Sequence, residues 1–149
     1  MAGSGPKKEE PNISAPHAIL IEAQSGSVLF ERGADDLIFP ASLGKLATAE
    51  YLFNEIQQGR VKLTDEWQVS ENAWRKGGAP SGTSTMFAAI HSRVPVEDLI
   101  RGMIVQSAND ACIVVAEALA GNEYEFGKKL TARQRALGFP KSVYANSNG

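Results

Sequence analysis

The stretch Pro40–Leu46, with the sequence PASLGKL, decides the fold because it joins an extended segment to the start of a helix. Proline disfavours helix for the residue before it and permits helix just after it. Small and apolar residues then recur at helical spacing, at Leu46, Ala49, Phe53 and Ile56. Because Gly59 is a natural helix end, we predict a largely buried helix over residues 42–58.

Ser42 and Lys45 lie three positions apart at the start of this helix, so their side chains share one face, a single turn apart. A serine hydroxyl becomes a good nucleophile when a base takes its proton, and a lysine amine can do so if burial or a second cation lowers its pKa. Backbone N–H groups at the helix N-terminus can stabilise negative charge on a carbonyl oxygen under attack. The spacing alone is a weak signal, since Ser4 and Lys7 repeat it.

A second element is the sequence SAN at residues 107–109, which falls in a short break between two apolar segments. Two helices are predicted there, over residues 95–105 and from a cap at Asn109 or Asp110 to Ala120. A hydroxyl and an amide in such a break can both point into a cleft. The element therefore strengthens the interpretation of the upstream serine as a nucleophile.

The flanking sequence adds a hairpin, a loop and a third helix. Two β-favouring runs, residues 18–22 and 27–31, are separated by a short connection, which predicts an antiparallel hairpin. The glycine-containing residues 77–85 predict a loop, and residues 123–137 an amphipathic helix. The polar opening, residues 1–16, is predicted to be a disordered leader.

Composition excludes several classes of protein. The 149 residues carry a formal net charge of -2 without a basic stripe, so we expect no nucleic-acid partner. Cys112 is the only cysteine, which leaves no internal disulfide, zinc cluster or redox pair. His17 and His91 share no ligand spacing, so neither a metal nor a cofactor is expected. No apolar run of the sequence is long enough to span a bilayer.

The sequence resembles the D-alanyl-D-alanine carboxypeptidase family of penicillin-binding proteins, whose signature is Ser-x-x-Lys, Ser-x-Asn and Lys-Thr-Gly. The resemblance covers about residues 17–149 and is carried by SGSVL at 25–29, PASLGKL at 40–46, VSENAW at 69–74, VEDLIRG at 96–102 and SANDA at 107–111. It implies the α/β (α+β) fold of penicillin-binding proteins and serine β-lactamases, in which helices flank an antiparallel sheet. Only the first hairpin and the helical half of that fold are represented in this chain.

The resemblance also implies a role for each residue of the site. Ser42 would attack the carbonyl of the penultimate D-alanine of a peptidoglycan stem peptide, expel the terminal D-alanine and form an acyl-enzyme that water hydrolyses. Lys45 would be the general base, Ser107 would pass a proton towards the leaving amine, and Asn109 would hold Lys45 and the amide of the substrate. β-Lactam antibiotics would acylate the same serine, with slow deacylation.

Two features depart from the family pattern. Gly44 replaces the threonine or other β-branched or polar residue that is usual before the lysine, and a glycine within a helix costs roughly 1 kcal/mol relative to alanine. No Lys-Thr-Gly occurs in the sequence; in the family it supplies a cation, contacts to the substrate carboxylate and part of the oxyanion hole. We therefore expect residues 17–149 to be an incomplete domain, inactive without its missing C-terminal part.

Two other functions stay open. A serine β-lactamase would share the Ser-x-x-Lys pair, although the Glu-x-x-Leu-Asn deacylating element of one common class is absent from the sequence. A catalytically silent domain that binds peptidoglycan or β-lactams would share the fold. For a peptidoglycan substrate we expect a periplasmic or other extracytoplasmic location, with any membrane anchor in a missing segment.

Overall fold

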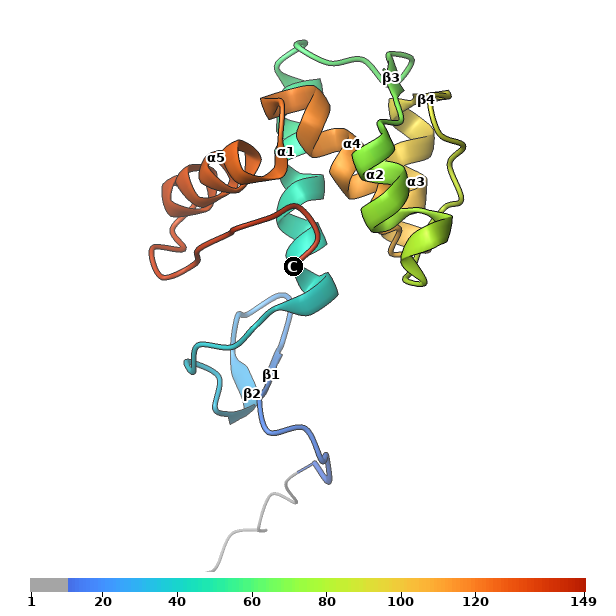
Figure 1. Ribbon diagram of the computed structural model, residues 1–149. Helices are drawn as coiled ribbons and strands as arrows, with labels where there is room; N and C mark the ends of the chain where they lie inside the picture. The colour runs from blue at the N-terminus through green and yellow to red at the C-terminus, as the bar shows by residue number, and fades with distance from the viewer. Residues whose placement is uncertain (1–10) are drawn as a thin grey trace, which may run out of the picture. The chain divides into compact units, whose positions relative to one another are not determined.

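The computed structural model describes residues 11–149, and the chain divides into two compact units between Ile38 and Phe39 (Figure 1). Most of the predicted leader, residues 1–16, therefore lies outside the described residues. Among residues 11–149, no helix combines the length and the apolar composition that are needed to cross a membrane.

The first unit contains the predicted hairpin, which is confirmed. Strand β1 (Ala18–Ile21) pairs antiparallel with β2 (Val28–Arg32). In the connection Gly26 takes a φ of +72°, a left-handed conformation that glycine adopts without steric cost. Its N–H donates to the carbonyl oxygen of Glu22 at 2.9 Å. The two β-favouring runs are thus joined by a tight turn.

The second unit is mainly helical (Figure 1). Its elements in chain order are the 3₁₀ turn η1 (Ala41–Gly44), α1 (Lys45–Gln57), β3 (Glu66–Gln68), α2 (Glu71–Gly77), the 3₁₀ turn η2 (Ala79–Ser81), β4 (Arg93–Pro95), α3 (Val96–Val105), α4 (Asn109–Ala120) and α5 (Glu123–Ala136). Strands β3 and β4 form a two-stranded antiparallel sheet. Each predicted helix is present, but α1 begins later than expected, because residues 41–44 form a 3₁₀ turn before it.

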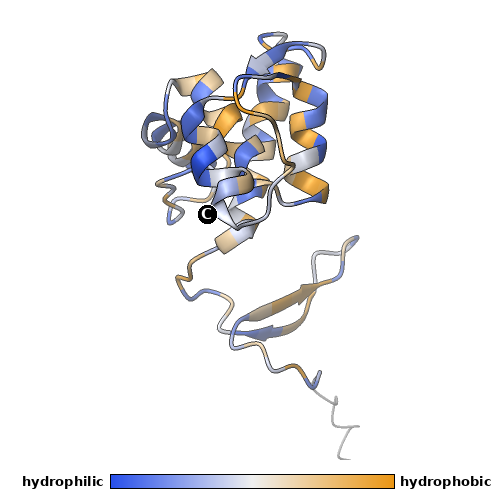
Figure 2. Ribbon diagram, turned by 45° about the vertical axis from the view of Figure 1, so that its right-hand side comes forward, coloured by the Kyte–Doolittle hydropathy of each residue, from blue (hydrophilic) through white to orange (hydrophobic). Residues whose placement is uncertain are grey.

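The core of the second unit lies where its helices meet, and α4 is at the centre. Residues Asp110–Ala116 of this helix are all buried. Of these, Ala111–Ala116 belong to one hydrophobic cluster with buried side chains of the neighbouring helices, namely Leu52, Leu99, Met103, Phe126 and Leu130. Figure 2 shows the hydrophobic segments of these helices in orange. Because α4 is covered on most sides, it is apolar around most of its circumference rather than along a single stripe.

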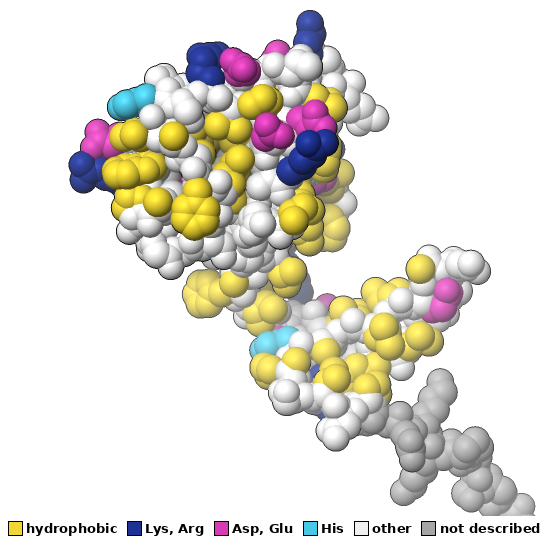
Figure 3. Space-filling model, turned by 90° about the vertical axis from the view of Figure 1, so that its right-hand side faces the viewer, with side chains coloured by type: hydrophobic (Ala, Val, Ile, Leu, Met, Phe, Trp, Pro, Cys, Tyr) yellow, Lys and Arg dark blue, Asp and Glu magenta, His cyan; other side chains and the backbone are white. Residues whose placement is uncertain are grey.

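The buried face of α1 differs from the predicted one. Its buried residues are Lys45, Ala47, Thr48, Ala49 and Leu52. By contrast, Leu46 is 62% exposed and Phe53 is 50% exposed, so the prediction of a largely buried apolar stripe is wrong at these two positions. Hydrophobic side chains also reach the surface elsewhere in the second unit (Figure 3). Helical spacing identifies the apolar positions of a helix, but it does not show which of them pack against other residues and become buried.

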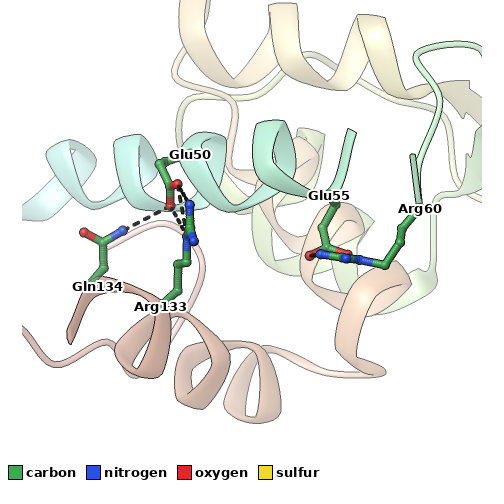
Figure 4. Close-up of polar contacts among 5 residues, drawn as sticks. All are labelled: Glu50, Glu55, Arg60, Arg133 and Gln134. Atoms are coloured by element: carbon green, nitrogen blue, oxygen red, sulfur yellow. Dashed lines mark hydrogen bonds and ion pairs between the residues drawn. The ribbon is translucent and has the colours of Figure 1, made fainter. Parts of the chain in front are cut away.

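A polar cluster joins α1 to α5 (Figure 4). The Glu50 carboxylate accepts hydrogen bonds from Arg133 Nη2 at 2.6 Å and Nε at 3.1 Å, and from Gln134 Nε2 at 3.5 Å. A second pair lies at the end of α1, where Glu55 in the last turn accepts two bonds of 2.7 Å from Arg60, which follows the helix. The bidentate geometry of the Arg133–Glu50 pair favours a fixed orientation of α5 relative to α1.

The last residues of the chain run back to the start of α1 (Figure 1). The Thr48 hydroxyl donates to the carbonyl oxygen of Ser147 at 2.7 Å, and the Ser147 hydroxyl donates to Glu123 at 2.9 Å. A Cβ added to Gly44 would lie only 3.1 Å from the Cα of Gly149. Packing therefore explains the glycine at position 44, because a residue without a side chain leaves room for this returning segment.

Candidate active site

The side chains of Ser42, Lys45 and Ser107 meet at the start of α1. The Nζ atom of Lys45 lies 3.0 Å from Ser42 Oγ, 2.9 Å from Ser107 Oγ and 2.8 Å from the carbonyl oxygen of Ser107. Ser42 lies in η1 and Lys45 is the first residue of α1, so a single helical turn sets their separation. Ser107 comes from the break between α3 and α4. The structure thus brings together three of the four predicted site residues.

The backbone of Ser107 adopts a left-handed conformation, with φ at +54°, in which both of its oxygens reach Lys45. Ala41, directly before Ser42, is also left-handed, with φ at +46°. Residues other than glycine adopt this region rarely, and those that do cluster at functional sites, where the surrounding structure holds them in place. Phe87 and His91 are left-handed as well, so two of the four such non-glycine residues described lie in or next to the Ser42–Lys45–Ser107 group.

Burial sets the protonation behaviour of Lys45. The residue is 4% exposed, and its desolvation lowers the pKa of the amine below the usual lysine value. Within residues 11–149, no carboxylate forms an ion pair with it. A Cys112 thiolate would oppose the shift, but burial raises the pKa of that thiol to about 12. The thiol is therefore neutral near physiological pH and does not hold a charge on Lys45.

The arrangement can activate a nucleophile. A neutral Lys45 amine has a lone pair, and at 3.0 Å it is within reach of the Ser42 hydroxyl proton. Ser42 itself is exposed, so its oxygen is accessible to a ligand. Ser107 Oγ is within reach of the same amine and can exchange a proton with it. One buried amine is therefore within hydrogen-bonding reach of two hydroxyls.

Asn109, the fourth predicted residue, is placed differently from the expectation. Its side-chain Nδ2 donates to Thr83 Oγ1 at 2.9 Å, and its backbone N–H donates to the carbonyl oxygen of Ser84 at 2.8 Å. Among the described residues, the Lys45 amine bonds to Ser42 and Ser107, and no hydrogen bond joins it to Asn109. Asn109 is instead fastened to the loop that follows α2.

Asp110, which the sequence predicts only as a helix cap, has a structural role at the site. It is fully buried, and its carboxylate accepts from the Thr85 hydroxyl at 2.7 Å, from Met86 N–H at 3.0 Å and from Ala88 N–H at 3.2 Å. The N-cap position of α4 is Ala108, which makes no side-chain cap. The predicted cap is therefore wrong, and Asp110 holds the loop at residues 85–88 against the start of α4.

Replacing Asp110 with alanine is expected to destabilise the second unit. The substitution leaves the Thr85 hydroxyl and the N–H groups of Met86 and Ala88 without their acceptor, and buried groups left unsatisfied cost about 3 kcal/mol in total. Denaturant unfolding followed by circular dichroism measures the loss. Asp110→Asn keeps one acceptor oxygen and should lose less, while the exposed Asp35→Ala is the control. An Asp110→Ala protein as stable as the control would contradict this role.

Gly77, the last residue of α2, packs directly against the backbone at the start of α4. A Cβ added there would lie 2.4 Å from Asp110 N and 2.5 Å from Asn109 C, both closer than atoms can approach. The neighbours are backbone atoms and cannot rotate away. The glycine is therefore required for α2 to support the segment that carries Asn109.

Comparison with known proteins identifies the family. A family model described as D-alanyl-D-alanine carboxypeptidase matches residues 5–149. The chain belongs to this family. Among curated members of the D-alanyl-D-alanine carboxypeptidases, DacC of Escherichia coli (strain K12) is 36% identical over 142 residues, a match that covers 95% of this chain and 36% of DacC. The chain spans about a third of the length of the curated relatives that it matches.

Solved structures of penicillin-binding proteins have the same fold. Penicillin-binding protein 5 from Haemophilus influenzae is 31% identical with a TM-score of 0.85, over 99% of this chain and 41% of that one. Penicillin-binding protein D2 from Listeria monocytogenes in its cefotaxime-bound form is 25% identical with a TM-score of 0.78, over 94% of this chain and 55% of that one. The predicted fold class is confirmed.

Proposed function

We propose that this chain carries the nucleophile and the base of a serine-type D-alanyl-D-alanine carboxypeptidase that removes the terminal D-alanine from peptidoglycan stem peptides. One observation carries the proposal: a buried lysine amine, which forms no ion pair within residues 11–149, lies between the hydroxyl groups of Ser42 and Ser107, at 3.0 and 2.9 Å. Membership of the carboxypeptidase family supports the choice of reaction.

In the proposed reaction, neutral Lys45 takes the proton of Ser42 while Oγ bonds to the carbonyl carbon of the penultimate D-alanine. The C–N bond to the terminal D-alanine then breaks. Its nitrogen receives a proton through Ser107, whose hydroxyl is 2.9 Å from the Lys45 amine. Water attacks the resulting ester and releases the shortened peptide and free Ser42. Asn109 is proposed to bind an amide of the substrate.

β-Lactam antibiotics are proposed to acylate the same serine. The penicillin-binding protein D2 of Listeria monocytogenes, which has the same fold, is solved in a cefotaxime-bound form. A β-lactam presents a strained amide to the nucleophile, so attack by Ser42 opens the ring and leaves a covalent adduct. The proposed partners of the site are thus a D-Ala-D-Ala peptide and β-lactams.

The remaining part of the domain is proposed to be necessary for turnover. Two exposed apolar side chains support this, since Leu43 in η1 is 68% exposed and Leu46 in α1 is 62% exposed, close to Ser42. An additional layer of the domain over this face would bury them. The substrate also implies that the protein acts outside the cytoplasm, where peptidoglycan lies. Residues 1–149 alone are accordingly expected to be inactive.

A fluorescent penicillin tests the function in the full-length protein. Covalent labelling followed by slow release supports a carboxypeptidase, and release of D-alanine from a D-Ala-D-Ala peptide completes the assignment. Rapid release of the label would indicate a β-lactamase instead. A protein that takes no label and releases no D-alanine would be a silent binding domain, which would overturn the proposal.

The pH dependence of acylation should report the lowered pKa of Lys45. Only the neutral amine can accept the Ser42 proton, so the acylation rate rises with pH as Lys45 loses its proton. Because burial lowers the pKa of this amine, the rising limb should have its midpoint below the usual lysine value of about 10.4. Stopped-flow acylation by the fluorescent penicillin between pH 5 and pH 10 measures the limb. A rate independent of pH over this range would contradict Lys45 as the base.

A further inference from the structure

A chain of hydrogen bonds runs from the Asn109 side chain into the loop after α2. Asn109 Nδ2 is 2.9 Å from Thr83 Oγ1, which in turn is 2.8 Å from Ser81 Oγ. Ser81 Oγ is 2.7 Å from the carbonyl oxygen of Gly78, which is the last group of this series of hydrogen bonds. The proposed function assigns a role to Asn109 but none to the residues behind it.

The Gly78 carbonyl at the end of this series determines which group donates and which accepts in each hydrogen bond. A carbonyl oxygen can only accept, so the Ser81 hydroxyl must donate its single proton to Gly78. Ser81 Oγ is then an acceptor for Thr83, and it also accepts from the Thr83 backbone N–H at 3.2 Å. The Thr83 proton is thereby committed to Ser81. Towards Asn109, Thr83 can only accept.

This direction determines which way round the Asn109 amide lies. An amide has an NH₂ edge that donates and an oxygen edge that accepts, and the two are nearly the same shape. Thr83 can bond only to the NH₂ edge, because its own proton is committed elsewhere. We propose that Thr83 is a positioning residue, whose hydroxyl oxygen fixes the orientation of the Asn109 amide towards the substrate. The inference rests on the proposed function.

The loop that carries Thr83 is itself held in place. Asp110 binds it at Thr85, Met86 and Ala88, and the backbone N–H of Asn109 binds it at Ser84. Thr83 therefore cannot follow the Asn109 side chain if that side chain rotates. Because Thr83 is exposed, its hydroxyl can be removed without leaving a cavity in the core.

The first test replaces Thr83 with valine, which keeps the branched shape and removes the acceptor. In the full-length protein, the second-order rate of acylation by a fluorescent penicillin should fall about 3- to 10-fold, as expected for one neutral hydrogen bond. Thr83→Ser should restore most of the rate, because serine keeps the hydroxyl. Ser92→Ala is the matched control, since it removes another loop hydroxyl bond, to the Ala89 carbonyl, without touching Asn109. Its rate should equal that of the wild type.

A double-mutant cycle separates positioning from a general effect on the loop. With Asn109→Ala in place, Thr83→Val should cause no further loss, because Thr83 acts only through the amide. Equal losses with and without the Asn109 side chain would overturn the inference and leave the proposed function standing, as would a Thr83→Val rate equal to that of the wild type. A wild-type protein that takes no label would overturn both.

Discussion

Replacing Ser42 with alanine is expected to abolish covalent labelling by penicillin and to lower D-alanine release from a D-Ala-D-Ala peptide by about 10⁴-fold or more, the usual effect of removing a catalytic nucleophile. The reason is chemical rather than structural. Ser42 is exposed, and the one side-chain hydrogen bond described for it is the contact of 3.0 Å with Lys45, so the fold should survive its loss.

Mass spectrometry of the labelled wild-type protein should place the adduct on the peptide that contains Ser42. The Ser42→Ala protein should show an unchanged melting temperature and no adduct. Ser142→Ala, which removes a hydroxyl from the loop after α5, should label as the wild type does. Labelling of Ser42→Ala at an undiminished rate would show that another residue is the nucleophile.

Replacing Lys45 with methionine is expected to lower the acylation rate by about 10²- to 10⁴-fold, the range typical of a lost general base. Methionine has a similar length and is apolar, so it suits a position that is 4% exposed. Lys45→Arg should lose as much activity, because a guanidinium keeps its proton at all accessible pH values and has no lone pair to offer.

The arginine variant decides between two roles for Lys45. If the amine accepts the Ser42 proton, both variants fail; if it acts only through positive charge, arginine should retain much of the rate. Stopped-flow acylation by the fluorescent penicillin gives both rates, and Lys62→Met, at an exposed lysine, is the control. If the Lys45→Arg protein is acylated at nearly the wild-type rate, Lys45 is not the general base.

The parts of the site that depend on local geometry could be predicted from the sequence. Ser42 and Lys45 are one turn apart, so any helix that starts near Pro40 brings them together. The break at residues 106–108 was likewise visible as an interruption between two apolar segments. Such features follow from the spacing of residues along the chain, and the structure places them as expected.

The parts that depend on distant contacts could not be predicted. Nothing in the sequence says that Asn109 bonds to Thr83, which is 26 residues away, or that Asp110 binds three groups of the same loop. An aspartate beside a helix start has the same local pattern whether it caps the helix or holds a loop. The exposed positions of α1 were missed for the same reason, since periodicity does not name the surface that would cover them.

Gly77 shows how the site can be lost through a change that touches none of its reacting groups. Every other amino acid adds at least a Cβ, which would lie 2.4 Å from the backbone nitrogen of Asp110. Any missense change in the codon of Gly77 therefore forces α2 away from the start of α4. Such a change would displace the segment that carries Ser107 and Asn109 while leaving the sequence of both motifs intact.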